Sequence, residues 1–516
     1  MDRRQFLLVS LASAALTACG GVSSGGSAGR SSENGNNSSV SSSSSSAAAD
    51  QWSLLDEQLT GSVIRPGETR YASIAPAYNS RYDGITPEAV IRCASVEDIQ
   101  KVIAFAQTHK LALVPRSGGH GYAGYSTSEG IVLDLHELSS VTLGDGTATI
   151  GAGAKLVDVY DQLTAKGVAI PLGSCLSVGI GGLTQGGGIG IVDRAYGLTC
   201  DNLLSAEVVL ADGRIISCDA TNHPDLFWAL RGGGGGNFGV VTQFTFKTHP
   251  TRDITTLEAY FDFEDFVAVM TAFQAWPETL PDHIWAQVIP GWNSASASPS
   301  LYVRAFCIGS KTEMSSHWQQ FVVLAGVSPL SMTQSTNSYR DTMLGNCASN
   351  TASCHIAGYD PAGRAQRNAF AASSDFFHEP INEAGLLVLR QAILDSRTAG
   401  NYGMMIMDLM RGAIDKFAPD ETAFIHRGAL FSIEYYTYFP LGTANSTVDK
   451  AQVWVNSFRQ TMRPWSSGGA YVNYIDPLIE DWAQAYYGAN YPRLQQVKAT
   501  YDLQGFFTLP QGIKAV

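Results

Sequence analysis

The sequence predicts an α+β fold, in which helices and mostly antiparallel strands build more than one domain. Between residues 84 and 250, short apolar strand patterns are interrupted by amphipathic helices and hairpins, without a regular strand–helix repeat. Between residues 255 and 460, long aromatic strand patterns alternate with helical stretches, which indicates an antiparallel sheet flanked by helices. The chain has 516 residues, more than one ordinary core can use, so two domains and a tail are expected.

Composition and charge indicate an acidic globular protein. Apolar residues make up 45% of the chain and aromatic residues 10%, which is enough to build sizeable cores. The formal net charge is −13, and the chain has no basic run beyond Arg3 and Arg4. Nucleic-acid binding is therefore set aside as a class, because it depends on basic patches.

The first 19 residues have the pattern of an export signal. Arg3 and Arg4 precede a short apolar run, Phe6 to Leu16, which is too short for a stable membrane span. "DRRQFL" is similar to the twin-arginine signal of bacteria, and "LTAC" resembles a lipobox that would make Cys19 a lipidated N-terminus. An ordinary secretion signal and an incidental cysteine are the alternatives. We expect an exported protein, periplasmic or at the cell surface, whose one membrane contact is a lipid at Cys19.

Changes in composition divide the rest of the chain. Residues 20–50 are rich in Ser and Gly, lack core residues and predict a disordered linker. Residues 51–252, with a core at 84–250, form the first predicted domain. Residues 253–465 form a second domain suited to be the wall of a substrate site, and residues 466–516 form a C-terminal segment.

The first domain has a local signal for each element. "SVEDIQKVIAFAQTHK" begins with Ser95, has Asp98 three residues later, and predicts a capped amphipathic helix. "LALVP" and "IVLDL" follow as buried strands. "VTLGDGTATIGA" and "AEVVLADGRIISC" predict hairpins that turn at residues 144–146 and 212–213. "KLVDVYDQLTAKG" predicts a second helix, ended by Gly167.

The second domain is predicted from "HIWAQVIP", "SLYVRAFCIG" and "ALFSIEYYTYF", long aromatic strands, and from helical stretches such as "EAGLLVLRQAILD".

The cysteine pattern gives little evidence on metal binding or on disulfides. The chain contains neither C-x-x-C nor H-x-x-x-H, so no metal site is expected. "CASNTASC" could join Cys347 to Cys354 in a small disulfide loop, with free thiols as the alternative.

Three glycine-rich elements in the first domain predict a large bound cofactor. "LVPRSGGHGYAGYST" sets His120 among glycines directly after a strand, and "GSCLSVGIGGLTQGGGIG" and "HPDLFWALRGGGGGNFGVVT" follow. Glycine lets the backbone approach a ligand closely, and successive backbone N–H groups can surround a pyrophosphate. The spacing does not fit the Rossmann fingerprint. The glycines of any one element could serve only to form tight backbone turns, whereas three such elements in one domain favour a bound cofactor.

The same elements, with "LTCDNLLSAEVVLADG", resemble the FAD-binding domain of berberine bridge enzyme-like oxidases. These belong to the vanillyl-alcohol oxidase superfamily, whose FAD-binding domain is of the two-subdomain p-cresol methylhydroxylase type. The C-terminal "YVNYID…WAQAYYGANYPRLQQVKATYD…FF…PQGI" matches the family's closing segment. The resemblance implies that residues 51–252 bind FAD, that 253–465 bind substrate, and that 466–516 return to the FAD-binding domain.

The resemblance implies that FAD is attached covalently at two points. His120 matches the histidine bonded to the flavin ring, and Cys175 matches the cysteine that forms a second, thioether bond. Imidazole and thiolate are nucleophiles able to attack an electrophilic flavin. A turn histidine and a buried thiol are the alternatives. The other positions that match FAD contacts of the family are Arg116, Ser117, Gly118, Gly119, Gly121, Ser126, Val178, Gly181, Gly182, Asn202, Val208, Tyr471 and Asn473.

Oxidation at a flavin needs a base that takes a proton as hydride leaves the substrate. Tyr474, the second tyrosine of "YVNY", matches the catalytic tyrosine of several relatives and is the predicted base, with Tyr471 beside it. Glu434 matches the glutamate base of berberine bridge enzyme, and strand alternation places Tyr436 and Tyr438 on its face. The alternative role for the tyrosines is packing between domains.

The resemblance predicts an oxidase that acts on an alcohol or a C–N bond and reduces oxygen to hydrogen peroxide. Val178 matches the family's oxygen gate, where valine goes with oxidases and leucine with dehydrogenases. A sugar or oligosaccharide, oxidised at its anomeric hydroxyl, is the preferred substrate class. An aromatic, alkaloid-like or polyketide substrate, a dehydrogenase with another acceptor, and a flavin-carrying binding protein without turnover are the alternatives. The oligomeric state is not predicted.

Overall fold

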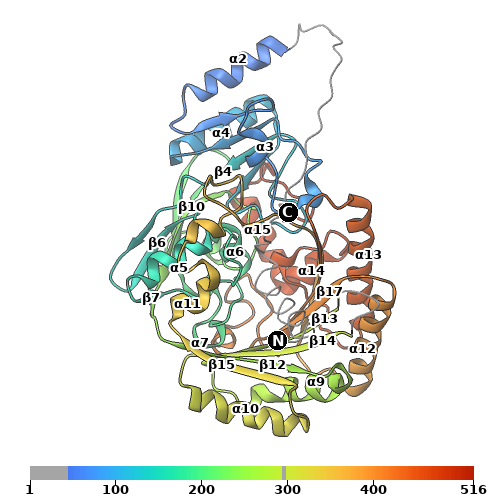
Figure 1. The fold of residues 1–516 in the computed structure, drawn as a ribbon. Coiled ribbons are helices and arrows are strands. Elements are labelled where there is room, and N and C mark those ends of the chain that lie inside the picture. The colour runs from blue at the N-terminus through green and yellow to red at the C-terminus, as the bar shows by residue number, and fades with distance from the viewer. Residues whose placement is uncertain (1–44, 293–297) are drawn as a thin grey trace.

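The computed structural model describes residues 45–292 and 298–516 (Figure 1). The predicted export signal, the lipobox with Cys19 and the linker up to residue 44 lie outside the described residues. Within these two ranges, no helix combines the length and apolar character that crossing a membrane requires.

The predicted linker extends too far at its C-terminal end. The first six residues of helix α2 (Ser45–Asp56) fall within the predicted linker, which ends at residue 50. Three consecutive alanines lie in its first half, and alanine has the highest helix propensity. The second half is buried through Trp52 and Leu55, and the Trp52 ring lies 4.8 Å from that of Phe105. Burial of Trp52 and Leu55 fixes the second half of the helix, and the alanines before them extend the helix toward its N-terminus.

Two sheets form the N-terminal half. The first has the order β1-β2-β4-β3, with the last three strands parallel. Its strands are β1 (Ser62–Ile64), β2 (Ala89–Arg92), β4 (Ile131–Asp134) and β3 (Leu113–Arg116). The second is antiparallel, with the order β5-β6-β10-β8-β9. Its strands are β5 (Val141–Leu143), β6 (Thr147–Gly151), β10 (Val240–Lys247), β8 (Leu203–Val209) and β9 (Ile215–Asp219). The predicted hairpins are β5–β6 and β8–β9.

The helices of this half are mostly short. Ser95 caps α4 (Val96–His109), and its hydroxyl accepts the amide proton of Asp98 at 3.1 Å. The Asp98 carboxylate accepts from the amides of Thr60, Gly61 and Ala94, so it also fixes the chain before β1. The other elements are α3 (Tyr71–Ile74), α5 (Leu156–Thr164), α6 (Ile180–Gly186), α7 (Asp193–Tyr196), α8 (Pro224–Ala229) and the small β7 (Val168–Ala169)–β11 (His249–Pro250) pair.

A seven-stranded antiparallel sheet dominates the second half, in the order β15-β12-β14-β13-β17-β18-β16. Its strands are β15 (Ser331–Asn337), β12 (Ile254–Phe261), β14 (Ser300–Cys307), β13 (Ile284–Trp292), β17 (Gly403–Leu409), β18 (Phe431–Phe439) and β16 (Ala369–Phe377). One face packs against α9 (Phe266–Ala275), α10 (Lys311–Ala325), α12 (Glu383–Thr398) and α13 (Asn445–Met462) (Figure 1). The other face is free to form the wall of a site between the two halves.

The C-terminal segment packs on the first half through α14 (Trp482–Tyr487) and α15 (Tyr491–Tyr501), with α15 against α8. The Tyr487 hydroxyl donates to the Gly233 carbonyl at 3.0 Å, and the Ile513 amide donates to the Asn237 side chain at 3.0 Å. These bonds hold the third glycine-rich element in place.

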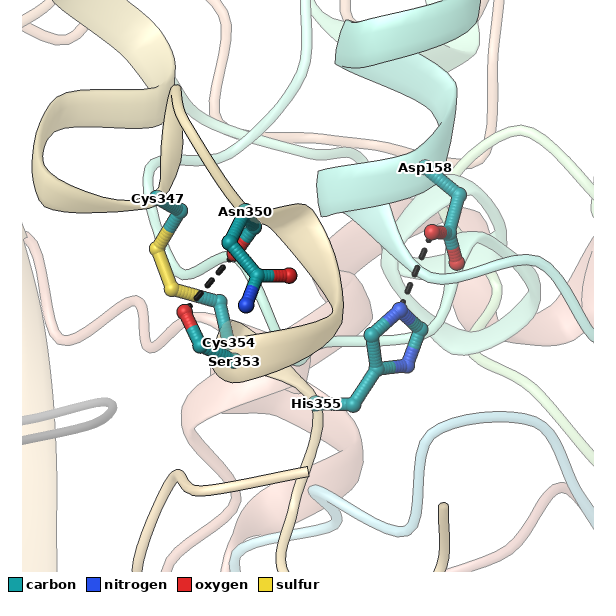
Figure 2. The surroundings of a disulfide bond; sticks show 6 residues. All are labelled: Asp158, Cys347, Asn350, Ser353, Cys354 and His355. Atoms are coloured by element: carbon teal, nitrogen blue, oxygen red, sulfur yellow. Dashed lines mark hydrogen bonds and ion pairs between the residues drawn. A yellow bond between two sulfur atoms is a disulfide. The ribbon is translucent and has the colours of Figure 1, made fainter. Parts of the chain in front are cut away.

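A disulfide loop also connects the halves (Figure 2). The structure confirms the bond between Cys347 and Cys354, directly after α11 (Tyr339–Leu344). The next residue, His355, lies 3.0 Å from the Asp158 carboxylate on α5, and the Arg340 guanidinium pairs with Asp161 on the same helix. The segment around the disulfide loop is therefore bonded to α5 of the first half through Arg340 on one side of the loop and His355 on the other.

Candidate functional site

A cavity of about 310 Å³ lies between the two halves. All three glycine-rich elements line it, together with the free face of the seven-stranded sheet and the C-terminal 3₁₀ turn Val472–Tyr474. The predicted site residues in its wall are His120, Cys175, Ser117, Gly118, Gly119, Gly121, Ser126, Val178, Gly181, Gly182, Tyr471, Asn473, Tyr474 and Glu434. Residues predicted from distant parts of the chain thus meet in one space.

The glycines in this wall serve two purposes. A Cβ atom added to Gly118 would lie 2.1 Å from the Gly179 nitrogen, so these two glycines let two loops pack against each other. A Cβ atom added to Gly182 would meet no heavy atom within 4 Å, although Gly182 lines the cavity. Backbone at such a position is open to a ligand, which fits the binding of a large flat cofactor.

His120 is held as a neutral imidazole. Its ring stacks on Tyr78 with centroids 3.9 Å apart, and its Nε2 lies 3.1 Å from the Ser177 hydroxyl. Burial, followed by the nearby Lys155 ammonium, lowers the pKa of His120 to about 3. A neutral imidazole in the cavity wall keeps a nitrogen lone pair, which a nucleophile requires.

Three predicted cofactor contacts, Arg116, Asn202 and Val208, lie outside the cavity wall, and their contact with FAD stays a prediction. The Arg116 guanidinium bonds to the Asp134 carboxylate at 3.0 Å and to the Ile74 carbonyl at 2.6 Å. The Asn202 amide donates to Leu198, and Val208 is buried within β8. The buried guanidinium and the buried amide thus have partners within the protein, and these bonds help to position the neighbouring loops.

The sheet contributes a buried carboxyl group to the cavity. Glu434 on β18 accepts a hydrogen bond from the Tyr122 hydroxyl at 2.9 Å. Burial raises the pKa of Glu434 to about 8, the Tyr122 hydrogen bond opposes this rise, and the charge of Asp408 adds to it. Glu434 therefore exchanges its proton near neutral pH, where a general base is most useful.

The two tyrosines of the C-terminal turn are less suited to take a proton. Burial, and then the charges of Glu434 and Asp408, raise the pKa of Tyr474 well above its ordinary value. Tyr474 stacks on Tyr122 with centroids 5.3 Å apart. The Tyr471 hydroxyl accepts from the Gly188 amide at 2.7 Å and from the Asn473 amide at 2.9 Å, so it fixes the cavity wall. This geometry favours Glu434 over Tyr474 as the base.

Several polar residues of the cavity were not predicted from the sequence, among them Tyr122, Gln287, Arg304 and Asp408. The strand register places Gln287 beside both Arg304 and Asp408, so they form a row across β14, β13 and β17. With its amide oxygen toward Arg304, Gln287 accepts two hydrogen bonds of 2.8 Å from the guanidinium. Burial raises the pKa of Asp408 to about 7, against the influence of Arg304. A single polar residue within an otherwise apolar strand was the available signal for each of the last three.

Two family models match the chain. One, described as FAD binding domain, matches residues 87–219, and one described as Berberine and berberine like matches residues 470–514. Both ranges contribute to the cavity wall.

Known proteins are similar over nearly the whole chain. The uncharacterized FAD-linked oxidoreductase YgaK of Bacillus subtilis (strain 168) is 30% identical over 465 residues, which cover 88% of this chain and 97% of YgaK. The structure of BBE-like 1 from Physcomitrella patens has a TM-score of 0.81 at 28% identity, covering 90% of this chain and 99% of that one. Chitooligosaccharide oxidase of Gibberella zeae is 27% identical and covers 87% of this chain and 91% of its own. A chitooligosaccharide oxidase structure has a TM-score of 0.79 at 26% identity, covering 90% of this chain and 100% of its own.

Proposed function

Because the chain belongs to the berberine bridge enzyme-like family of FAD-linked oxidoreductases, we propose that it is an oxidase acting on an alcohol group of a carbohydrate. One observation carries the proposal. A single cavity joins glycine-rich backbone, which can hold FAD, to a buried carboxyl group with a pKa of about 8, which can accept a proton.

The cofactor is held by the three glycine-rich elements and by two side chains. Residues 117–121, 181–182 and 234–236 line the cavity, so their backbone lies where a pyrophosphate can approach it closely. We infer that His120, which lines the same cavity, forms one covalent bond to the flavin ring. We infer that Cys175, which also lines the cavity and is disulfide-bonded in the structure, forms the second bond once that disulfide is reduced. When bound, FAD supplies a hydride acceptor whose electrons pass to oxygen. Val178 lines the same cavity, and its small side chain is consistent with oxygen as the acceptor.

The chain's own residues handle the proton. We propose that ionised Glu434 takes the proton of the substrate hydroxyl while the adjacent C–H bond delivers its hydride. The Tyr122 hydroxyl donates to the Glu434 Oε1 atom and so fixes the direction of the carboxylate. Tyr474 stacks on Tyr122 and keeps that phenol in place.

The wall opposite the glycine-rich elements supports a carbohydrate substrate. Gln287, Arg304 and Asp408 offer hydrogen-bond donors and acceptors in one row, as a ligand with several hydroxyl groups requires. Trp285 and Tyr436 line the cavity too, and aromatic faces can pack on a sugar ring. The similarity to chitooligosaccharide oxidase points the same way. The aromatic lining also suits an aromatic alcohol, which is the second candidate substrate.

A peroxide-coupled screen tests the proposal. The purified yellow protein is mixed in air with neutral oligosaccharides and, separately, with aromatic alcohols, while the flavin absorbance is followed without oxygen in parallel. We expect an oligosaccharide to bleach the flavin and to yield one equivalent of peroxide per oxidised substrate in air. Bleaching by aromatic alcohols alone contradicts the substrate class. Bleaching that air does not reverse contradicts the oxidase assignment, and no bleaching by any substrate favours a binding protein.

Location is a separate proposal, supported by residues 1–19 alone. We propose that the protein is exported and that Cys19 carries a lipid. Labelled fatty acid should appear in the wild-type protein and not in a Cys19→Ser variant, and label in both would contradict the proposal.

A further inference from the structure

Three potential metal ligands meet at one end of the seven-stranded sheet. His283 directly precedes β13, Cys307 ends β14, and Glu313 lies in the first turn of α10. The register pairs Ile284 with Cys307, which brings the start of β13 beside the end of β14. This group, called the His-Cys-Glu cluster below, is separate from the residues that line the cavity.

The ligand atoms of the cluster lie close enough to share one cation. The His283 Nε2 atom is 2.7 Å from Glu313 Oε1, and the Cys307 Sγ atom is 3.8 Å from Glu313 Oε2. One ligand atom from each of the three residues lies within 4.8 Å of the other two. Ligands about 2.0 to 2.3 Å from a tetrahedral zinc ion are about 3.3 to 3.8 Å apart, so a small adjustment suffices.

The backbone around the cluster is fixed before any ligand binds. The Ile308 amide donates to the His283 carbonyl at 3.0 Å, and the Ser310 hydroxyl caps α10 by accepting from the Glu313 amide. A Cβ atom added to Gly309 would lie 2.3 Å from Glu313 Oε2 and 2.9 Å from Cys307 Sγ. A side chain at position 309 would therefore displace the Glu313 carboxylate from its present place beside the thiol.

The cluster is open to solvent on one side. The side chains of His283 and Glu313 are 38% and 37% exposed, whereas Cys307 is fully buried, so a cation and a water molecule can approach from one side.

We propose that His283, Cys307 and Glu313 bind one Zn²⁺ ion, with water as the fourth ligand. Nitrogen, sulfur and oxygen donors are those that zinc takes in proteins. Binding releases the thiol proton of Cys307 and joins α10 to the ends of β13 and β14. Trp285, two residues after His283, lines the cavity, so the ion would stabilise the strand that carries it. This site departs from the sequence-based expectation of no metal, and it does not depend on the proposed oxidase activity.

Metal titration of the intact, tag-free protein tests the site. The protein is treated with a chelator, dialysed, and titrated with Zn²⁺ by calorimetry, and Co²⁺ is used as a spectroscopic probe at wavelengths longer than flavin absorption. We expect one equivalent of Zn²⁺, a higher Tm with Zn²⁺, and visible Co²⁺ bands of tetrahedral type. Cys307→Ser and Glu313→Gln should each weaken binding at least about tenfold, since loss of even an outer-shell partner has that effect.

Two variants serve as matched controls. Cys218→Ser removes another buried free thiol, on β9, and His317→Asn removes a histidine of α10 that lies outside the cluster. Both should bind Zn²⁺ as the wild type does. The proposal is overturned if the wild type binds no Zn²⁺, or if the folded Glu313→Gln and Cys307→Ser variants bind it as tightly as the two controls. Circular dichroism and flavin content establish that each variant is folded.

Discussion

Replacing Glu434 by glutamine tests the proposed base most sharply. The substitution keeps the size of the side chain and the acceptor for the Tyr122 hydroxyl, but it removes the proton-accepting group. General-base catalysis contributes about 10²- to 10⁴-fold, so kcat/KM should fall by about that factor. The Tm should not fall, because the carboxyl group is already largely neutral at pH 7, with a pKa of about 8.

The pKa of Glu434 sets how strongly kcat/KM of the wild type should depend on pH. Raising the pKa of Glu434 from 4.5 to about 8 corresponds to about 5 kcal/mol against the ionised form. Only the ionised form acts as a base, and the group is roughly one tenth ionised at pH 7 and half ionised at pH 8. We therefore expect kcat/KM to rise about fivefold from pH 7 to pH 8, and about twofold more above pH 8.

Two neighbours of Glu434 should move this midpoint in opposite directions. The Tyr122 hydrogen bond lowers the pKa of Glu434, so Tyr122→Phe should shift the midpoint above pH 8. The Asp408 charge raises that pKa, so Asp408→Asn should shift the midpoint below pH 8. Steady-state peroxide formation from pH 5 to pH 10 measures all three profiles. The reasoning is refuted if Glu434→Gln keeps its activity and pH profile while Tyr474→Phe loses both.

Three further predictions concern stability and oxygen. Removing the Cys347–Cys354 disulfide by a double serine substitution should lower the unfolding free energy by about 2 to 3 kcal/mol for so short a loop, read from non-reducing denaturation; an unchanged midpoint would contradict it. Asp201→Asn removes the charge that pairs with the Arg427 guanidinium at 2.6 Å, where the Arg427 side chain is 2% exposed. It should lower the unfolding free energy in urea by about 3 to 5 kcal/mol, whereas Asp212→Asn, in an exposed pair, should lower it by less than about 1 kcal/mol. Val178→Leu should slow reoxidation of the reduced flavin by air in stopped-flow, with substrate-driven reduction unchanged; equal reoxidation rates would exclude a gate at this position.

Elements with strong local signals were predictable from the sequence. Ser95 and the apolar face of the residues that follow it predicted the start of α4, and the glycine-containing turns predicted both hairpins. The start of α2 was not predictable, because alanines next to a serine run extend a helix only once Trp52 is buried. Local pattern determines these elements, whereas tertiary burial decides where α2 begins.

The site was predictable where sequence motifs carry it and not where the fold builds it. The loops around His120 and Cys175 are continuous in sequence, and both residues line the cavity. The Gln287, Arg304 and Asp408 row comes from three strands, so only the register of the sheet brings it together. Arg116 belongs to the first glycine-rich element, but its guanidinium pairs with the Asp134 carboxylate. A buried guanidinium requires such a charged partner, and the motif alone does not show which residue supplies it.

Peptide mapping of the flavin tests the central claim most directly. Trypsin should release residues 117–155, which contain His120, and residues 167–194, which contain Cys175. The account predicts one cross-linked species in which a single flavin joins these two peptides, while His120→Ala leaves the flavin on 167–194 alone. Recovery of both peptides unmodified from fully loaded, yellow enzyme would contradict it.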